Sequence, residues 1–326
     1  MSLSVRAVHR SFGTVRALDG VSLEARPGAV TALIGPNGSG KTTLLLILAG
    51  LLVPDAGEVR VGGYDVAVHG YAARARTGWM PDAFGTWDSL TAREVLRTFA
   101  AAYRMAPDRG AARAAELLET VHLTEFADRP ASVLSRGQKQ RLGLARALVH
   151  DPEVLLLDEP ASGLDPRSRV DLRVLLRRLA AEGRTVLVSS HVLTELDEMA
   201  DDAVFLSRGR TAASGSVASA EAGPRTWRLR ALSFPALTRW LDSAGAAWRP
   251  DDDADGRGAG PDSGPDSGPG AGPGAGPGGV LVEVQGEEGA AALLRDAVAA
   301  GVPVTSLAPA GGALEQAYLA LEEERR

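Results

Sequence analysis

The hydrophobic positions of this chain follow two patterns that alternate along much of its length. Short apolar runs, such as residues 29–34 and 154–157, are typical of strands buried on both faces of a sheet. Between such runs, apolar residues recur at helical spacing, as in residues 44–49 and 166–179. This alternation predicts an α/β fold with a largely parallel sheet, which places ligands at the carboxyl ends of its strands.

The same patterns predict the other elements of the first two thirds of the chain. Strands are expected at residues 3–8, 15–24, 57–61, 75–80, 184–190 and 203–207. Helices are expected from residue 91, where Thr91 and Glu94 form a capping box, and at 111–121, 139–149 and 192–199. Residues 91–150 therefore form an all-helical insert in the α/β framework.

The last third of the chain has its own alternation and predicts a small α/β domain at residues 216–326. The expected order is strand 225–232, helix 234–244, strand 280–285, helix 287–300, strand 302–307 and a last helix that includes Leu314 and Leu321. This order suggests a ferredoxin-like sandwich. Residues 250–279 interrupt it with repeats of Gly, Pro, Asp and Ser, and they are predicted to be a solvated, disordered segment.

A glycine-rich loop follows the apolar run 29–34 and precedes the helix predicted at 44–49. It consists of Gly35, Pro36, Asn37, Gly38, Ser39, Gly40, Lys41, Thr42 and Thr43. A strand, such a loop and a helix in this order form a phosphate cradle, because glycines let the backbone N–H groups point inward. Lys41 supplies a cation for the β- and γ-phosphates and Thr42 a hydroxyl for Mg²⁺. The chain has only two lysines, Lys41 and Lys139, and one of them lies where a phosphate cradle requires a lysine.

The bulk composition narrows the class of protein. At 326 residues with 45% hydrophobic residues, the chain is long enough for two domains with real cores. A net charge of −6, spread along the chain, argues against nucleic acid as the main partner. The absence of cysteine excludes disulfides and thiolate metal sites and fits a cytosolic protein. The longest apolar run, residues 44–53, is too short to span a bilayer, so any membrane role requires a partner.

Four further stretches lead to a known family. They are Leu134-Ser135-Arg136-Gly137-Gln138, the apolar run that ends at Asp158-Glu159, Ser162-Gly163-Leu164-Asp165, and His191 after a predicted strand. In order and spacing, together with the glycine loop, they resemble the signature, Walker B, D-loop and switch histidine of the ATP-binding cassette family across roughly residues 1–215. The tail, with its ending at residues 312–318, is similar to that of ATPase subunits of bacterial ABC-2-type exporters. The resemblance implies a P-loop NTPase cassette with N-terminal antiparallel strands, a mostly parallel core sheet and a helical signature subdomain at about 91–150.

The chemistry of hydrolysis is expected to rest on Lys41, Asp158, Glu159 and His191. Asp158 is suited to hold Mg²⁺, largely through water, and Glu159 beside it to orient or deprotonate the attacking water. The resemblance implies that His191 contacts the γ-phosphate. It also implies that Phe12 stacks on adenine, with core packing as the alternative for a lone aromatic residue.

The resemblance also implies that one subunit completes the ATP site of another. Ser135, Gly137, Gln138 and Asp165 are therefore expected to contribute to nucleotide binding, with the start of a helix facing the γ-phosphate. Neither half-site is complete alone, so ATP should join a head-to-tail pair and hydrolysis should release it. Arg136 replaces the first glycine of the signature pair, a departure that keeps Gly137.

A second departure lies at Asp82, where the family usually has glutamine near Mg²⁺ and the membrane partner. Aspartate could still ligate Mg²⁺ through water. Phe84, Trp87 and Leu90 are candidates for an apolar surface that docks the partner, with core packing as the alternative.

The function predicted is an ATPase subunit that binds ATP and Mg²⁺ and drives export through a separate transmembrane permease at the cytoplasmic face of the membrane. A homodimer is expected on ATP binding, and nucleic acid is not an expected partner. The alternative is a soluble ABC ATPase with a role in translation or on DNA; such proteins usually carry two cassettes, a coiled coil or zinc-binding cysteines. A P-loop kinase or GTPase does not explain residues 134–138.

Overall fold

The computed structural model describes residues 2–82, 85, 89–190, 192–251 and 279–323. The chain divides into two compact units, Met1–Val217 and Ala218–Arg326, and each is described by itself.

The first unit is built on a six-stranded sheet in the order β10-β9-β3-β8-β7-β6. Its strands are β3 (Val30–Ile34), β6 (Thr77–Met80), β7 (Val154–Asp158), β8 (Thr185–Ser190), β9 (Asp202–Ser207) and β10 (Arg210–Ser216). The five strands from β9 to β6 are parallel, and only β10 pairs in the antiparallel direction. Every residue of β3, β7 and β8 is buried, which the apolar runs 29–34 and 154–157 predict for β3 and β7. The expectation of a mostly parallel α/β core is confirmed.

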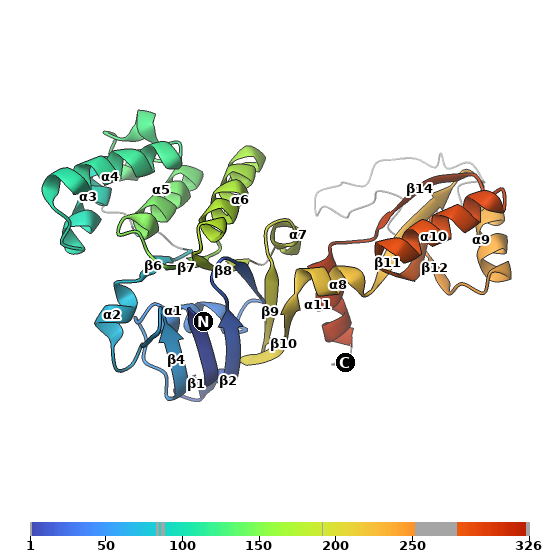
Figure 1. The fold of residues 1–326 in the computed structure, drawn as a ribbon, viewed down its shortest axis with the longest axis horizontal. Coiled ribbons are helices and arrows are strands. Elements are labelled where there is room, and N and C mark those ends of the chain that lie inside the picture. Colours follow the sequence, from blue (N-terminus) through green and yellow to red (C-terminus); the bar gives the residue numbers. More distant parts are fainter. Residues whose placement is uncertain (1, 83–84, 86–88, 191, 252–278, 324–326) are drawn as a thin grey trace, which may run out of the picture. The chain divides into compact units, whose positions relative to one another are not determined.

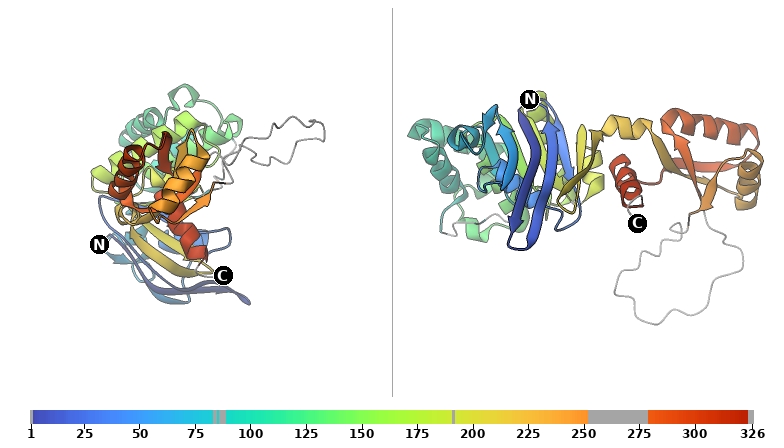
Figure 2. Two further views of the ribbon diagram at one scale, coloured as in Figure 1. Left: turned by 90° about the vertical axis from the view of Figure 1, so that its right-hand side faces the viewer. Right: turned by 90° about the horizontal axis from the view of Figure 1, so that it is seen from below.

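A second, antiparallel sheet has the order β2-β1-β4-β5. It is formed by β1 (Leu3–Phe12), β2 (Val15–Ala25), β4 (Ala56–Val61) and β5 (Tyr64–Asp65). The long dark-blue strands β1 and β2 run side by side in Figure 2. Alternate residues of β1 and β2 join a core with α1 (Lys41–Leu48), of which Leu44, Leu45, Ile47 and Leu48 are buried.

The helices of the first unit lie mainly in the predicted insert. They are α3 (Ala92–Ala102), α4 (Pro107–Thr120), the 3₁₀ turns η1 (Thr124–Phe126) and η2 (Ala131–Val133), and α5 (Arg136–Leu148), which cluster at the top left of Figure 1. Thr91 caps α3 with the expected capping box. Pro107 begins α4 at the N1 position, where its missing N–H costs nothing, so this helix starts four residues before the predicted residue 111.

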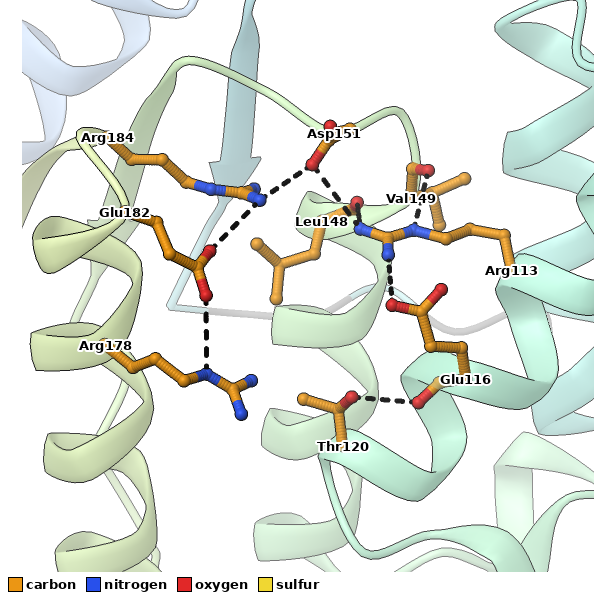
Figure 3. A network of polar contacts seen from close by, with 9 residues as sticks. All are labelled: Arg113, Glu116, Thr120, Leu148, Val149, Asp151, Arg178, Glu182 and Arg184. Atoms are coloured by element: carbon orange, nitrogen blue, oxygen red, sulfur yellow. Dashed lines mark hydrogen bonds and ion pairs between the residues drawn. The ribbon is translucent and has the colours of Figure 1, made fainter.

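A polar network ties this helical insert to the sheet (Figure 3). Arg113 of α4 donates to the carbonyl oxygens of Leu148 and Val149 at the end of α5, at 2.9 and 3.4 Å. Asp151 accepts a 2.7 Å hydrogen bond from Arg184, at the start of β8, and lies 3.8 Å from Arg113. The network thus satisfies carbonyls that an α-helix leaves open at its C-terminus.

The remaining helices of the chain are α2 (Gly70–Arg74), α6 (Pro166–Ala181), α7 (Leu193–Asp197), α8 (Val217–Ala222), α9 (Phe234–Ser243), α10 (Gly286–Ala299) and α11 (Ala313–Glu323). Seven short elements have no counterpart among the predicted ones: β5, α2, η1, η2, β10, α8 and β12 (Trp248–Pro250). All are between two and seven residues long, too short for a periodicity to stand out.

The second unit is a four-stranded antiparallel sheet with the order β12-β13-β11-β14. Its strands are β11 (Pro224–Ala231), β12 (Trp248–Pro250), β13 (Val280–Gln285) and β14 (Val304–Pro309). With α9 after β11 and α10 after β13, this is the β-α-β-β-α-β arrangement of ferredoxin-like sandwiches. Its small core contains Leu229, Leu237, Leu241, Val280 and Val282.

The limits predicted for the disordered segment, residues 250–279, are too wide. Pro250 pairs with Val280, and the Asp251 N–H donates to the carbonyl oxygen of Gly279 at 3.1 Å. The Asp251 side chain is 1% exposed and lies 2.6 Å from Nε of Arg228. Backbone pairing and an ion pair therefore hold the two ends of the β12–β13 connection together. The polar composition of the segment does not reveal this ion pair. Residues 252–278 lie outside the described part of the chain.

Candidate functional site

The glycine loop joins the end of β3 to the start of α1, where the sequence predicts it. Residues 35–40 form the loop, and Lys41, Thr42 and Thr43 are the first turn of α1. A Cβ on Gly35 would lie 2.3 Å from the carbonyl oxygen of Leu206, and one on Gly40, at φ 104°, would lie 2.7 Å from that of Ala17. Only glycine fits both places, and α1 has no side-chain cap, so its first N–H groups remain available to an anion.

Lys41 folds back into this loop. Its Nζ donates to the carbonyl oxygens of Gly35 and Pro36 at 2.7 and 3.2 Å, and the residue is only 7% exposed. Burial lowers the pKa of Lys41, while the charges of Glu159 and Asp158 oppose this shift. The buried Ser39 Oγ has no hydrogen-bond partner among the described residues. A confined cation and an unsatisfied hydroxyl in one loop fit a phosphate group that accepts from both.

Asp158 at the end of β7 faces the same loop. Its Oδ2 accepts a 2.9 Å hydrogen bond from Thr42 Oγ1, and its Oδ1 a 2.6 Å hydrogen bond from Ser189 Oγ on β8. Among the described residues, no group of three or more His, Asp or Glu side chains is gathered for a metal ion. A single carboxylate next to a threonine hydroxyl fits Mg²⁺, which takes few protein ligands and fills its octahedron with phosphate oxygens and water.

Glu159 adopts an unusual backbone conformation just beyond the strand, with φ at 51°. Its N–H donates to the Oγ and carbonyl oxygen of Ser189 at 3.1 and 3.2 Å. Its carbonyl oxygen accepts from Gln140 Nε2 at 3.1 Å and from the Ser162 N–H at 3.0 Å. A non-glycine residue in the left-handed region is costly, and such residues cluster at functional sites where their surroundings hold them in place.

Ser189 and Gln140 are the site residues that sequence analysis missed. Ser189 lies opposite Asp158 in the parallel register of β7 and β8, and Gln140 is buried on α5. A serine near the end of a predicted strand, two residues before His191, and a glutamine inside a predicted helix carry no local signal. Knowledge of the strand order would have placed Ser189 beside Asp158.

The signature residues form the N-terminus of α5. Ser135 is its N-cap, and in a capping box the Gln138 N–H donates to Ser135 Oγ at 3.2 Å while the Ser135 N–H donates to Gln138 Oε1 at 2.9 Å. A Cβ on Gly137 would lie 3.2 Å from the carbonyl oxygen of Gly163. The side-chain hydrogen bonds described for Ser135 and Gln138 therefore join these two residues to one another, whereas Lys41 and Thr42 gather with Asp158 in the cradle.

Asp165 is the N-cap of α6. Its carboxylate accepts from the N–H and Oγ of Ser168 at 3.1 and 2.6 Å, and these hydrogen bonds lower its pKa. Phe12 at the end of β1 is 48% exposed and lies under the Arg10 guanidinium at 4.9 Å, so the core alternative is wrong for this ring. Asp82 is exposed, two residues after β6 ends. Leu90 is half-buried, and His191, Phe84 and Trp87 lie outside the described residues.

A glycine loop between a buried strand and a helix, with an acidic pair at the end of another parallel strand two positions along the same sheet, defines a P-loop nucleotide-binding domain. Comparisons narrow this class. Residues 18–162 match the sequence model of the ABC transporter family. The chain is 39% identical over 215 residues to a daunorubicin resistance ATP-binding protein from Streptomyces coeruleorubidus, across 66% of this chain and 68% of that protein. It is 40% identical over 209 residues to a Nod factor export ATP-binding protein I from Paraburkholderia xenovorans, across 64% and 69%.

Solved structures agree with the sequence comparisons. An ATP-binding subunit of an ABC transporter matches with a TM-score of 0.63 and 28% identity, across 68% of this chain and 92% of that one. A dimeric ATP-binding cassette in a post-hydrolysis state bound to ADP and Pi matches with a TM-score of 0.61 and 28% identity, across 66% and 98%. The chain therefore belongs to the ATP-binding cassette (ABC) transporter family and is an ABC ATPase. In the part of the chain that the structure describes, no helix is long and apolar enough to cross a membrane.

Proposed function

We propose that this ABC ATPase is the ATP-hydrolysing subunit of an exporter and drives a separate transmembrane permease from the cytoplasmic face of the membrane. The observation that carries the catalytic part is the meeting of Lys41, Thr42, Asp158 and Glu159 at one edge of the parallel sheet. Export is supported by relatives named for daunorubicin resistance and Nod factor export. A role on ribosomes or DNA has no comparable support, since the chain carries a net charge of −6.

The cradle supplies the groups that hydrolysis of the β–γ phosphoanhydride bond of ATP needs. Lys41 exchanges the carbonyl oxygens of Gly35 and Pro36 for the β- and γ-phosphates, and the loop N–H groups hold the remaining oxygens. Thr42 and Asp158 would hold Mg²⁺, which when bound neutralises charge on the phosphates. Glu159 orients the attacking water and accepts its proton. His191 contacts the γ-phosphate, and Phe12 stacks on adenine through its exposed face.

A second subunit completes the site in this proposal. Ser135, Gly137 and Gln138 present a hydroxyl and the N-terminus of α5 to the γ-phosphate held by the P-loop of the partner, and Asp165 lies at the same interface. The dimeric form of a structurally similar cassette supports this pairing. Asp82, exposed after β6, ligates Mg²⁺ through water and links the site to the permease.

The two lysines of the chain provide a direct test. Lys41→Ala removes the cation of the cradle and should lower the rate of phosphate release from Mg-ATP by at least about 100-fold. Lys139→Ala, at a half-buried position of α5, serves as the matched control and should stay within about twofold of the parent. Hydrolysis by Lys41→Ala at a rate similar to that of the control would contradict the assignment.

A further inference from the structure

The segment Ser162-Gly163-Leu164-Asp165, called the D-loop below, connects β7 and Glu159 to α6. Its first residue contacts the catalytic strand end directly, because the Ser162 N–H donates to the carbonyl oxygen of Glu159 at 3.0 Å. Its last residue caps α6. The conformation of the D-loop therefore bears on where the Glu159 carboxylate points, since Glu159 is already held at φ 51° by contacts on both sides.

Arg136 of α5 holds one side of this loop. Its Nη2 donates to Ser162 Oγ at 2.7 Å. Its aliphatic stem lies against Gly163, where an added Cβ would be 2.8 Å from Arg136 Cδ. An arginine at the first position of a helix opposes the helix dipole, so stability of α5 does not explain its presence. The contact with the D-loop explains why an arginine stands at this position, which helix formation does not.

Arg169 of α6 holds the other side. Its Nε donates to the carbonyl oxygen of Leu164 at 3.1 Å, while its Nη1 lies 2.9 Å from Glu195 Oε1 on α7. The Glu195 side chain is only 13% exposed, so the ion pair is shielded on its acidic side and anchors the guanidinium. One planar group thus bridges the D-loop backbone and the helix that follows β8.

The next two arginines on the same face of α6 also form ion pairs with acidic residues. Among the described residues, no contact of these two arginines with the D-loop is seen. Arg173 pairs with Glu198, and Arg177 lies 2.6 Å from Asp201 and donates to the carbonyl oxygen of Met199. These pairs join α6 to the chain after α7 in the same way, and they provide internal controls for any effect that comes from the ion pairs alone.

We propose that Arg136 and Arg169 are positioning residues that clamp the D-loop and thereby fix Glu159 in its working orientation. The proposal rests on the proposed function, because Glu159 is the residue through which both arginines act. Neither arginine contacts the nucleotide cradle of its own subunit among the described residues, so both act on the rate of hydrolysis and not on ATP binding.

The test uses full-length Arg136→Ala and Arg169→Ala, with Arg173→Ala as the matched control. At saturating Mg-ATP, each clamp variant should lower kcat by about tenfold, since small misplacements of catalytic groups have effects of this size or larger. The Kd for a fluorescent ATP analogue should stay within twofold, and the melting temperature should match that of the control. Arg136→Lys, which can still reach the Ser162 hydroxyl, should recover at least half of the lost rate.

Two outcomes overturn the clamp. In the first, kcat of the clamp variants equals that of Arg173→Ala. In the second, the Kd for the analogue rises as much as kcat falls, which places the arginines in nucleotide binding. Failure of the proposed function is distinguishable, because Lys41→Ala would then hydrolyse ATP like the parent in the same assay.

Discussion

Thr42 Oγ1 donates a hydrogen bond of 2.9 Å to Asp158 Oδ2, and this bond joins two elements that lie 116 positions apart in the chain. Thr42 belongs to the first turn of α1, and Asp158 is the last residue of β7. The pair sets the spacing between the phosphate cradle and the acidic strand end. Mg²⁺ between phosphate and protein would take the hydroxyl oxygen and the carboxylate from this pair.

Asp158→Asn keeps the shape of this side chain and removes its charge. We expect the Mg²⁺ concentration for half-maximal hydrolysis to rise at least about tenfold, because a neutral amide attracts the ion far less than a carboxylate does. Ser189→Ala, which removes the 2.6 Å hydrogen bond to Oδ1 and the 3.1 Å hydrogen bond from the Glu159 N–H but leaves the carboxylate charge, should change it much less. Mg²⁺ titrations of the ATPase rate measure both. Equal requirements in Asp158→Asn and the parent would remove Asp158 from the metal site.

His150 gives the fold a dependence on pH. Burial lowers its pKa from 6.5 to about 4, its ring is stacked on that of Tyr103 at 3.7 Å, and Nε2 lies 3.1 Å from the Thr77 carbonyl oxygen. The folded state therefore favours the neutral ring, while the unfolded state takes up a proton below about pH 6.5. Stability should be fully present above that pH and decrease as pH falls toward 4.

The measurement is urea unfolding at pH 7 and pH 5. After allowance for partial exposure of the ring, the loss assigned to His150 is on the order of 1 kcal/mol. His150→Phe keeps a ring to stack on Tyr103 and cannot take up a proton, so its unfolding free energy should change less over this interval. An unchanged difference between the two pH values in His150→Phe would contradict the assignment.

Deletion of residues 252–278, with Asp251 and Gly279 joined by a short glycine linker, should leave the melting temperature and the ATPase rate nearly unchanged. The composition of this segment is too polar and glycine-rich to contribute a core. The ion pair between Asp251 and Arg228, at the base of this segment, should contribute to stability. Asp251→Ala leaves Arg228 without its 2.6 Å partner and should destabilise the second unit by about 1–3 kcal/mol. Calorimetry of both variants separates the two effects; a loss of several degrees in the deletion would show that the segment packs.

The elements that sequence analysis predicted well are those whose signals are local. The P-loop is read from nine consecutive residues, and β7 from an unbroken apolar run, because a strand between two helical layers has no polar face. The ferredoxin-like order of the second unit also follows from the alternation of predicted strands and helices, although β12, which is only three residues long, was not predicted.

The features that the sequence could not provide depend on which strands are neighbours. Ser189 meets Asp158 only because β8 lies beside β7 in register, and Arg169 bridges the D-loop to Glu195 only because α6 packs beside α7. Likewise, the anchoring of Asp251 depends on a pair with Arg228 on another strand. Each of these contacts joins residues more than 20 positions apart, beyond the reach of any periodicity.

In the proposed mechanism, Glu159 of one subunit hydrolyses an ATP that the partner's signature helps to hold. Glu159→Gln keeps the side-chain shape and removes the base, so the ATP-bound pair should persist. Size-exclusion chromatography with light scattering, at roughly tens of micromolar protein where weak association becomes visible, measures the mass directly. The variant should pass from monomer to dimer with Mg-ATP and remain monomeric with ADP, and adding Ser135→Arg should suppress the dimer while ATP binding to the P-loop remains. Hydrolysis by Glu159→Gln at the parent rate, or an equal dimer in the double variant, would contradict the account.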